Sequence, residues 1–489
     1  MAAVGKTAGE VISDFFVKIR ETMEERVRVA CDSSVYNAAR TQWVVTVPNI
    51  WSEMERDRIK RAAVEAGMGR DLILLSELNA AVVHVFDSMS PRTLRGGDTF
   101  IVCDAGGGTI QTATYTIARE SPRCFNQIAG SGQVGGGVFV DLAFQSHLRR
   151  RLPANILDQI MQEDPAQWRE ILHEFQECVK KEYDPSIEYD ADCIFTLLVR
   201  QPGRKLKTAI HLERDHLHEI FDQEIRKIVV LLEAEVIKAA LRGSPPKAVI
   251  MVGGFGGAKC VEVAVNARLA RPIADIVESS PYHPTDAEFK NLRDSKLSAP
   301  LQIIQPSLGA AAVALGAARY GVDHDEEVAF WLVPKCSFGL TRERPWQWGH
   351  DPQEWMVRDA ETGSRWVVAE MEWGISKSKA FMPGAVFLYS FERRYGIGEK
   401  IVGFSHHVFC SYGDLGHRPK RLQIGMHSQC TCRVDPDKIP RGAFKIVRVD
   451  GTLYRQLDYK IAMKVSGRLL VVSVQAGGST IAETSTGFD

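Results

Sequence analysis

The sequence has little that would tie the protein to a membrane or to a charged polymer. Its 60 Lys and Arg residues nearly balance 61 Asp and Glu residues, giving a net charge of -1. We therefore expect neither nucleic-acid binding nor attachment to an anionic membrane, because both depend on a basic surface. The longest run of small apolar residues, 308–318, is shorter than the roughly 20 residues of a transmembrane helix. The 489-residue chain, with 45% hydrophobic residues, is typical of globular proteins.

A secretory signal and a disulfide pattern are also lacking. The first 16 residues show no basic start followed by a long apolar run. The ten cysteines are scattered, mostly alone within apolar segments, which is typical of reduced, buried cysteine. Cys430 and Cys432 form a C-x-C pair, but no second pair stands at a spacing that suits zinc. We therefore expect a cytoplasmic protein without a structural zinc site.

Strands and helices are expected to alternate over the first 90 residues. Helical spacing of apolar residues predicts helices over 10–30, 54–67 and 78–86. Short apolar runs at 43–48 and 71–77 predict buried strands. Alternation of strand and helix is typical of a parallel α/β sheet.

The pattern changes at residue 98. Strands are predicted at 98–104 and 110–118 around a glycine turn, and a strand with a glycine turn at 247–257. Long helical patterns lie between 138 and 241, with an insert near 184–205, and a last helix is expected near 308–321. Near 322 the composition shifts to Trp, Pro and Gly with alternating apolar residues. We therefore divide the chain into an α/β domain, 1–325, and a β-rich domain, 326–489.

The most informative motif is Asp-Ala-Gly-Gly-Gly-Thr at 104–109. Three consecutive glycines let the backbone approach a ligand and direct several N–H groups at one anion. Asp104 can hold the waters of a magnesium ion, and Thr109 offers a hydroxyl. The loop joins strand to strand, whereas P-loop and dinucleotide motifs join strand to helix. This favours a phosphate-binding hairpin, and the alternative is a tight hairpin with a purely structural role.

Two other glycine clusters precede helices. The glycines of 253–257 lie between a buried strand and a helix, where they could admit a nucleoside or a phosphate. A dinucleotide site is disfavoured, because Lys259 stands where that motif requires its third glycine. For the cluster 135–137, a structural turn is the better interpretation when it is taken alone.

An acidic and two basic residues share a predicted helix. Glu177 is followed at helical spacing by Lys180 and Lys181, so the three side chains are expected on one face. Taken without context, such a group is most simply a solvated ion-pair face.

In this order, the segments resemble the heat shock protein 70 (DnaK)–actin–sugar kinase ATPase superfamily, and within it the divergent heat shock 70 kDa protein 12-like branch of fungal type. The resemblance covers residues 41–321. It implies an actin-like ATPase fold of the ribonuclease H type, ATP or ADP and magnesium as ligands, and an extended polypeptide as client. The segments that carry it are WVVTVPNIWSEMERDRIKRAAVEAG, LILLSELNAAVVHVF, DAGGGT, GSGQVGGGVFVD, EFQECVKKEY, AVIMVGGFGG and PSLGAAAVALGAARYG.

The resemblance also implies roles for single residues. Asp104 would hold magnesium through water, and Thr109 would help to orient the attacking water, so both are catalytic candidates. Pro48 and Glu77 would sense the nucleotide and relay its state between domains. The nucleotide itself would be bound by Gly106, Gly107, Gly108, Thr109, Gly135, Gly136, Glu177, Lys180, Lys181, Gly253, Gly254 and Phe255.

The sequence departs from the family at its start. The first phosphate hairpin, Asp-x-Gly-Thr-Thr/Ser, is not found, and residues 1–40 already predict the helix that follows it in the family. That hairpin supplies an acidic metal residue, in typical members a catalytic lysine, and strands beside 43–48 and 71–77. We therefore expect an N-terminally truncated product or a degenerate relative, with weak or absent hydrolysis. Leu78, in place of proline after Glu77, also argues against an intact relay.

The expected function is that of a chaperone-like ATP-binding protein whose β-rich domain holds peptide or protein. Two alternatives stay open. One is a non-enzymatic scaffold or interaction protein that kept the fold and lost the chemistry. The other is a small-molecule kinase of the same superfamily, for which the sequence offers no recognisable general-base motif.

Overall fold

The computed structural model divides the chain into two compact units, Met1–Ala329 and Phe330–Asp489. They are called the first and second unit below. The mixed α/β first unit and the strand-rich second unit confirm the predicted fold class. The structure describes residues 5–31, 41–51, 53–88, 93–187, 193–200, 207–279, 299–323, 328–334, 336–358, 365–377, 379–382, 384–411, 420–422, 426–449, 451–466 and 469–487.

The first unit is built around a mixed sheet with the strand order β5-β4-β3-β8-β9. Strand β4 (Thr109–Glu120) is antiparallel to both β3 (Thr99–Ala105) and β5 (Arg123–Val134). Strands β8 (Pro246–Val252) and β9 (Gln302–Ile304) extend the sheet in parallel. Every residue of β3 is buried, since helices cover both faces of the sheet. The strands predicted around the two glycine turns are thereby confirmed.

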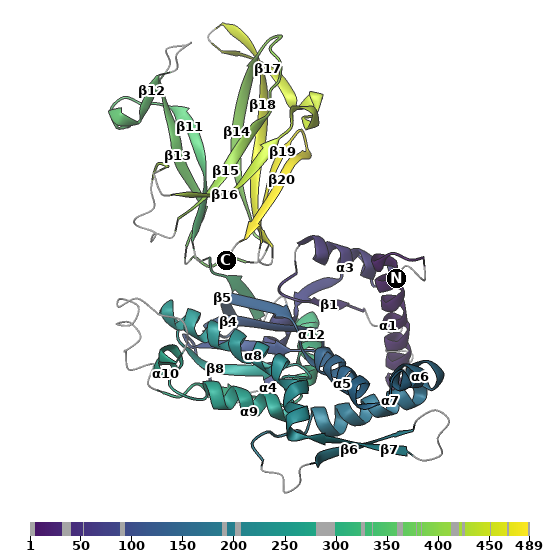
Figure 1. Cartoon of the computed structure of the whole chain (residues 1–489). Coiled ribbons are helices and arrows are strands. Elements are labelled where there is room, and N and C mark those ends of the chain that lie inside the picture. The colour runs from purple at the N-terminus through teal and green to yellow at the C-terminus, as the bar shows by residue number, and fades with distance from the viewer. Residues whose placement is uncertain are drawn as a thin grey trace. The chain divides into compact units, whose positions relative to one another are not determined.

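Different helices cover the two faces (Figure 1). On one face, apolar side chains of β3 and β8 share a core with α5 (Gly137–Arg151), α8 (Arg214–Leu241) and α9 (Lys259–Leu269). On the other face, α4 (Glu77–Ser88) packs on β3 and β4. The contact on this second face is aromatic and is made by Phe86, Phe100, Tyr115 and Phe125.

The strands predicted at 43–48 and 71–77 form a parallel pair of their own, β1 (Val44–Val47) and β2 (Ile73–Ser76). Helices cover both faces of this pair. Val45 and Leu74 pack with α1 and α3, whereas Val44 and Leu75 pack with α12. Apolar side chains on both faces of the pair therefore contact helices. The bounds of these helices are Ala8–Ala30, Glu53–Glu65 and Ala312–Asp323.

Two helical predictions need correction. The helix expected near 308 begins as α12 at Ala312, after a 3₁₀ turn, because Leu308 has a φ of 58° that an α-helix cannot include. The segment with Glu177 is a π-helix, Phe175–Lys180, and not a continuous α-helix. The remaining elements of the first unit are α6 (Ile156–Glu163), α7 (Pro165–Glu174), the hairpin β6 (Cys193–Arg200) and β7 (Lys207–Glu213), and α10 (Ile273–Glu278).

The second unit consists of two antiparallel sheets with a common apolar core. One has the order β12-β13-β11-β15-β16, and the other β14-β18-β19-β20 with β17 also paired to β18. Of the helices in the described part of the chain, none combines the length and apolar character needed to cross a bilayer. Strand β10 (Val328–Leu332) contains the unit boundary and is part of neither of these two sheets. Their strands are β11 (Ser337–Pro345), β12 (Met356–Arg358), β13 (Arg365–Ile375), β14 (Val386–Gly396), β15 (Phe404–Ser411), β16 (His427–Val434), β17 (Phe444–Val449), β18 (Thr452–Ser466), β19 (Leu469–Ala476) and β20 (Ser479–Gly487).

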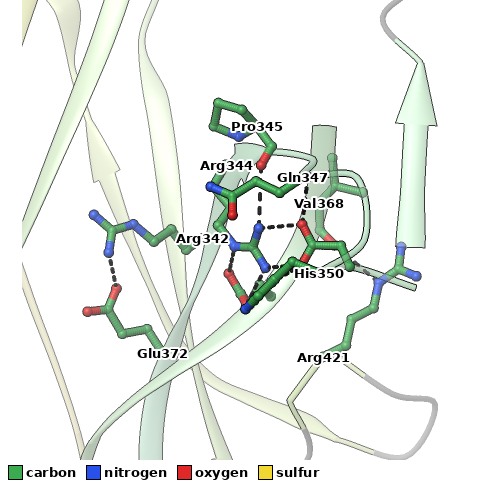
Figure 2. Close-up of polar contacts among 10 residues, drawn as sticks. Arg342, Arg344, Pro345, Gln347, His350, Val368, Glu372 and Arg421 are labelled. Atoms are coloured by element: carbon green, nitrogen blue, oxygen red, sulfur yellow. Dashed lines mark hydrogen bonds and ion pairs between the residues drawn. The ribbon is translucent and has the colours of Figure 1, made fainter. Parts of the chain in front are cut away.

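A charged cluster holds the turn that follows β11 (Figure 2). Arg344 donates to Asp351 through both terminal nitrogens at 2.7 Å and to Glu370 through Nε at 2.7 Å. The Asp351 side chain is only 2% exposed, and the Arg344 guanidinium holds the pKa of its carboxyl well below the usual range. The neighbouring Arg342–Glu372 pair, at 3.2 Å, is 44% and 40% exposed.

The two arginines are expected to differ in their contribution to stability. Arg344→Met leaves a buried carboxylate without its partner, so we expect a clear drop in the thermal unfolding temperature. Arg342→Met removes an exposed pair and serves as the matched control, with little change expected. Equal midpoints for the two variants in differential scanning calorimetry would contradict this interpretation.

Close packing of α4 and α12 is expected to depend on one glycine. A Cβ at Gly316 would lie 1.8 Å from the carbonyl oxygen of Ala80, so Gly316→Ala must push the helices apart. We expect a loss of about 3 kcal/mol in the free energy of unfolding, measured in urea. Gly309→Ala is the control, because its Cβ would meet Met251 O at an ordinary 3.6 Å. An unchanged urea midpoint for Gly316→Ala would refute the argument.

Candidate functional site

The glycine loop between β3 and β4 is open toward solvent. The Gly106 N–H donates to the Thr109 carbonyl at 3.1 Å and closes the loop. Among the described residues, the N–H groups of Gly107 and Gly108 have no hydrogen-bond partner. A Cβ at Gly108 would meet nothing within 4 Å. Two successive free N–H groups on an open loop suit an anion such as a phosphate.

A second glycine turn, at the start of α5, lies directly against this loop. Gly136 has a φ of 118°, and a Cβ there would lie 2.4 Å from Gly106 O, so only glycine fits. Backbone N–H groups of the turn donate to carbonyls of the loop at 2.9 to 3.2 Å, in the pairs Gly135–Gly108, Gly137–Gly106 and Val138–Gly107.

The third glycine turn follows β8 and approaches the end of β3. The Phe255 N–H donates to the Ala105 carbonyl at 3.0 Å. Gly253 has a φ of 87°, and a Cβ there would lie 2.4 Å from Asp104 Oδ1. Gly254 has open space beside its Cα, whereas the Phe255 side chain is 3% exposed and belongs to the core. The structure therefore brings this turn to Asp104 and places the Phe255 ring in the interior.

Two carboxyl groups lie beside the loop. Asp104 is 7% exposed, and its burial, together with the nearby charge of Glu77, raises its pKa to about 7. Burial also raises the pKa of Glu77, against the opposite effect of a hydrogen bond from Gln111. A bound cation would favour the ionised form of both groups. Within the described residues, no group of three or more His, Cys, Asp or Glu side chains lies close enough together to hold a metal ion directly.

Gln111 is a site residue that the sequence analysis missed. It is fully buried in β4, donates through Nε2 to Glu77 at 2.5 Å, and accepts the Asn49 N–H at 2.6 Å. Asn49 follows Pro48, so this amide connects Glu77 to the backbone next to Pro48. Gln111 also donates to Thr109 Oγ1 at 3.3 Å. The available signal was a glutamine two positions after the motif, within a strand that is otherwise largely apolar or threonine.

The predicted face with Glu177 and two lysines is divided in the structure. Lys181 pairs with Glu177 at 2.5 Å, and both side chains are about half exposed. Lys180 turns away and donates to Asp141 at 2.8 Å and to the Gly137 carbonyl at 2.6 Å. The expectation of one shared face is therefore wrong, because the π-helix changes the angle between successive side chains. Lys180 contacts the first turn of α5 instead.

Comparison with known proteins identifies the family of the first unit. Residues 7–323 match the model of the family described as "Hsp70 protein". Human heat shock 70 kDa protein 12B is 22% identical over 305 residues, covering 47% of this chain and 44% of that protein. The 12A proteins of human and mouse are each 21% identical over 232 residues, covering 36% of the chain and 34% of the relative. The chain thus spans less than half the length of these relatives.

The match to the family includes all three glycine turns, both carboxyl groups and Gln111. It also extends over about two thirds of the chain, from the first described helix to the end of α12. The resemblance seen in the sequence is confirmed. This chain belongs to the Hsp70 protein family.

Proposed function

We propose that the first unit binds ATP or ADP with magnesium at the hairpin between β3 and β4. The observation that carries the proposal is the pair of N–H groups on Gly107 and Gly108, which have no partner in the described part of the chain and lie next to the buried carboxyl of Asp104. Nucleotide and magnesium binding are general in the Hsp70 family. A nucleotide phosphate would accept from the two N–H groups, and the ion would neutralise charge on the phosphates.

The residues of the site can hold such a ligand. Asp104 would hold magnesium through water. Thr109 Oγ1, at the start of β4, would make a polar contact with the phosphate. The glycine positions 135, 136, 253 and 254 bring backbone close to the loop without side chains that would fill the space. Glu177 on the π-helix and Lys181 directly after it are exposed, and we propose that both contact the nucleoside.

We propose weak or absent hydrolysis. Phosphoryl transfer depends on several charges placed around the phosphate and metal. Around this hairpin the described acids are Asp104 and Glu77, and the predicted cationic ligand Lys180 is engaged by Asp141. These residues suit binding better than turnover.

We further propose a chaperone-like role in which the second unit holds an extended polypeptide. Support comes from a cavity of about 1030 Å³ that lies wholly within this unit. Aromatic and charged groups share its lining, which suits a peptide with mixed side chains. Its lining includes Arg342, Trp366, Phe391, Tyr459 and Lys460.

Nucleotide binding is tested by titration calorimetry on the full chain with Mg·ATP and Mg·ADP. We expect binding in the wild type and at least tenfold weaker binding in Asp104→Asn, since that change removes the anionic ligand of the ion. Asp98→Asn is the matched control, because Asp98 pairs with Lys247 just before β3, away from the hairpin loop.

Two other outcomes would favour the alternative functions. A folded protein that binds neither nucleotide would refute the proposal and favour the non-enzymatic scaffold. Transfer of phosphate to a small molecule in a substrate screen would favour the kinase instead.

The affinity for Mg·ADP is expected to rise with pH. Asp104, with a pKa of about 7, is mostly protonated at pH 6 and mostly ionised at pH 8, and the ion favours the ionised form. We expect roughly tenfold tighter binding at pH 8 than at pH 6. Asp104→Asn should lose this gain, whereas Asp98→Asn should keep it, which separates Asp104 from the titration of the nucleotide itself. The same pH slope in all three proteins would exclude Asp104 as its source.

A further inference from the structure

A buried glutamate on α8 accepts a hydrogen bond from the second glycine turn, whose other N–H groups donate to the hairpin. Glu224 is 3% exposed, and its Oε2 accepts the Gly136 N–H at 2.8 Å. Gly136 caps α5 without any side-chain hydrogen bond of its own. A Cβ at Gly135 would lie 2.8 Å from the same carboxylate oxygen, so the turn and Glu224 are in close contact.

The turn is therefore held between two partners. On one side its N–H groups donate to the carbonyls of Gly106, Gly107 and Gly108, and on the other side Gly136 donates to Glu224. Each peptide plane carries one N–H, so rotating the plane between Gly135 and Gly136 breaks the buried bond to Glu224, and rotating the next plane breaks the bond of Gly137 to Gly106. The orientation of the loop, and of its free N–H groups, consequently depends on Glu224.

We infer that Glu224 is a positioning residue of the nucleotide site, acting through Gly136 on the phosphate loop. This inference rests on the nucleotide binding proposed above. Glu224 itself need not contact the ligand, because its carboxylate is already occupied by Gly136 and by Lys227, whose Nζ lies 2.7 Å from Oε1.

The hydrogen bond to the turn depends on the length of the Glu224 side chain and not on its charge. Lys227 balances the carboxylate, and a glutamine could offer an oxygen acceptor at the same distance from the backbone. Aspartate would keep the charge but withdraw the oxygens by one methylene. Glu224→Gln and Glu224→Asp therefore separate the two properties.

The same helix provides a matched control. Glu235 is 1% exposed, accepts from Ser131 Oγ at 2.7 Å and from Thr114 Oγ1 at 3.4 Å, and lies 3.4 Å from Lys238. It is likewise a buried carboxylate with a lysine three residues on, but its partners are side chains of β4 and β5. If Glu224 only stabilised the fold, shortening either glutamate would have the same effect.

The test combines Mg·ADP calorimetry with hydrogen–deuterium exchange on the ligand-free full chain. We expect Glu224→Asp to weaken binding about tenfold and to speed exchange in a peptide containing Gly136, because the shorter side chain loses the hydrogen bond from the Gly136 N–H. Glu224→Gln should stay within about threefold of the wild-type affinity and exchange rate. Glu235→Asp should lower the unfolding temperature while leaving both readouts near wild type.

The outcomes separate this inference from the proposed function. Equal affinity and exchange in Glu224→Asp and the wild type, or equal effects of Glu224→Asp and Glu235→Asp, would overturn the role of Glu224. A wild-type protein without nucleotide binding would overturn the proposed function, and unchanged exchange at Gly136 in Glu224→Asp would then also remove the positioning role. Faster exchange with normal nucleotide affinity would likewise refute it, since the turn would move without affecting the site.

Discussion

Close approach between peptide backbones at the end of β3 is the interaction on which the rest of the first unit depends. Carbonyl groups from Ala105 to Gly108 accept N–H groups from two other turns, one before α5 and one after β8. Such contacts are possible only where a Cβ is missing, because a Cβ would lie 2.4 Å from Gly106 O at Gly136 and 2.5 Å from Ala105 O at Gly253. The glycines therefore join three segments far apart in the chain into one rigid edge of the sheet.

This arrangement explains why the remaining polar groups of the site are buried and paired. Gln111 donates a hydrogen bond to Glu77 and accepts one from the backbone N–H after Pro48. Glu224 accepts a hydrogen bond from the N–H of Gly136. An unpaired polar group in these positions would cost more than the hydrogen bond contributes. Asp104 differs from them, because burial leaves it with a pKa near neutrality. It is the group in this set whose charge a bound cation would change most.

The two units are stabilised by separate means. The first has a core in which sheet and helices interlock, with backbone contact at Gly316 joining α4 to α12. The second has an apolar core between two sheets and a charged cluster around Arg344 that holds one turn. The three glycine turns, Asp104 and Glu77 all lie within residues 7–323, which match the Hsp70 family model.

Most of the strands and helices, and the family, were determined by the sequence alone. Apolar periodicity located α1, β1, α3 and β3, because a helix and a strand each bury one repeating set of side chains. The order of glycine motifs carried the resemblance. The alternation of strand and helix predicted a parallel arrangement for β1 and β2. It did not predict a separate two-stranded sheet or the helices that cover both of its faces, because these depend on contacts between distant parts of the chain. The tertiary structure alone decided three further points: Lys180 turns to Asp141, Phe255 enters the core, and Gln111 and Glu224 reach the site. The physical reason is that each of these contacts joins residues at least 34 positions apart or depends on burial, and local patterns contain no such information.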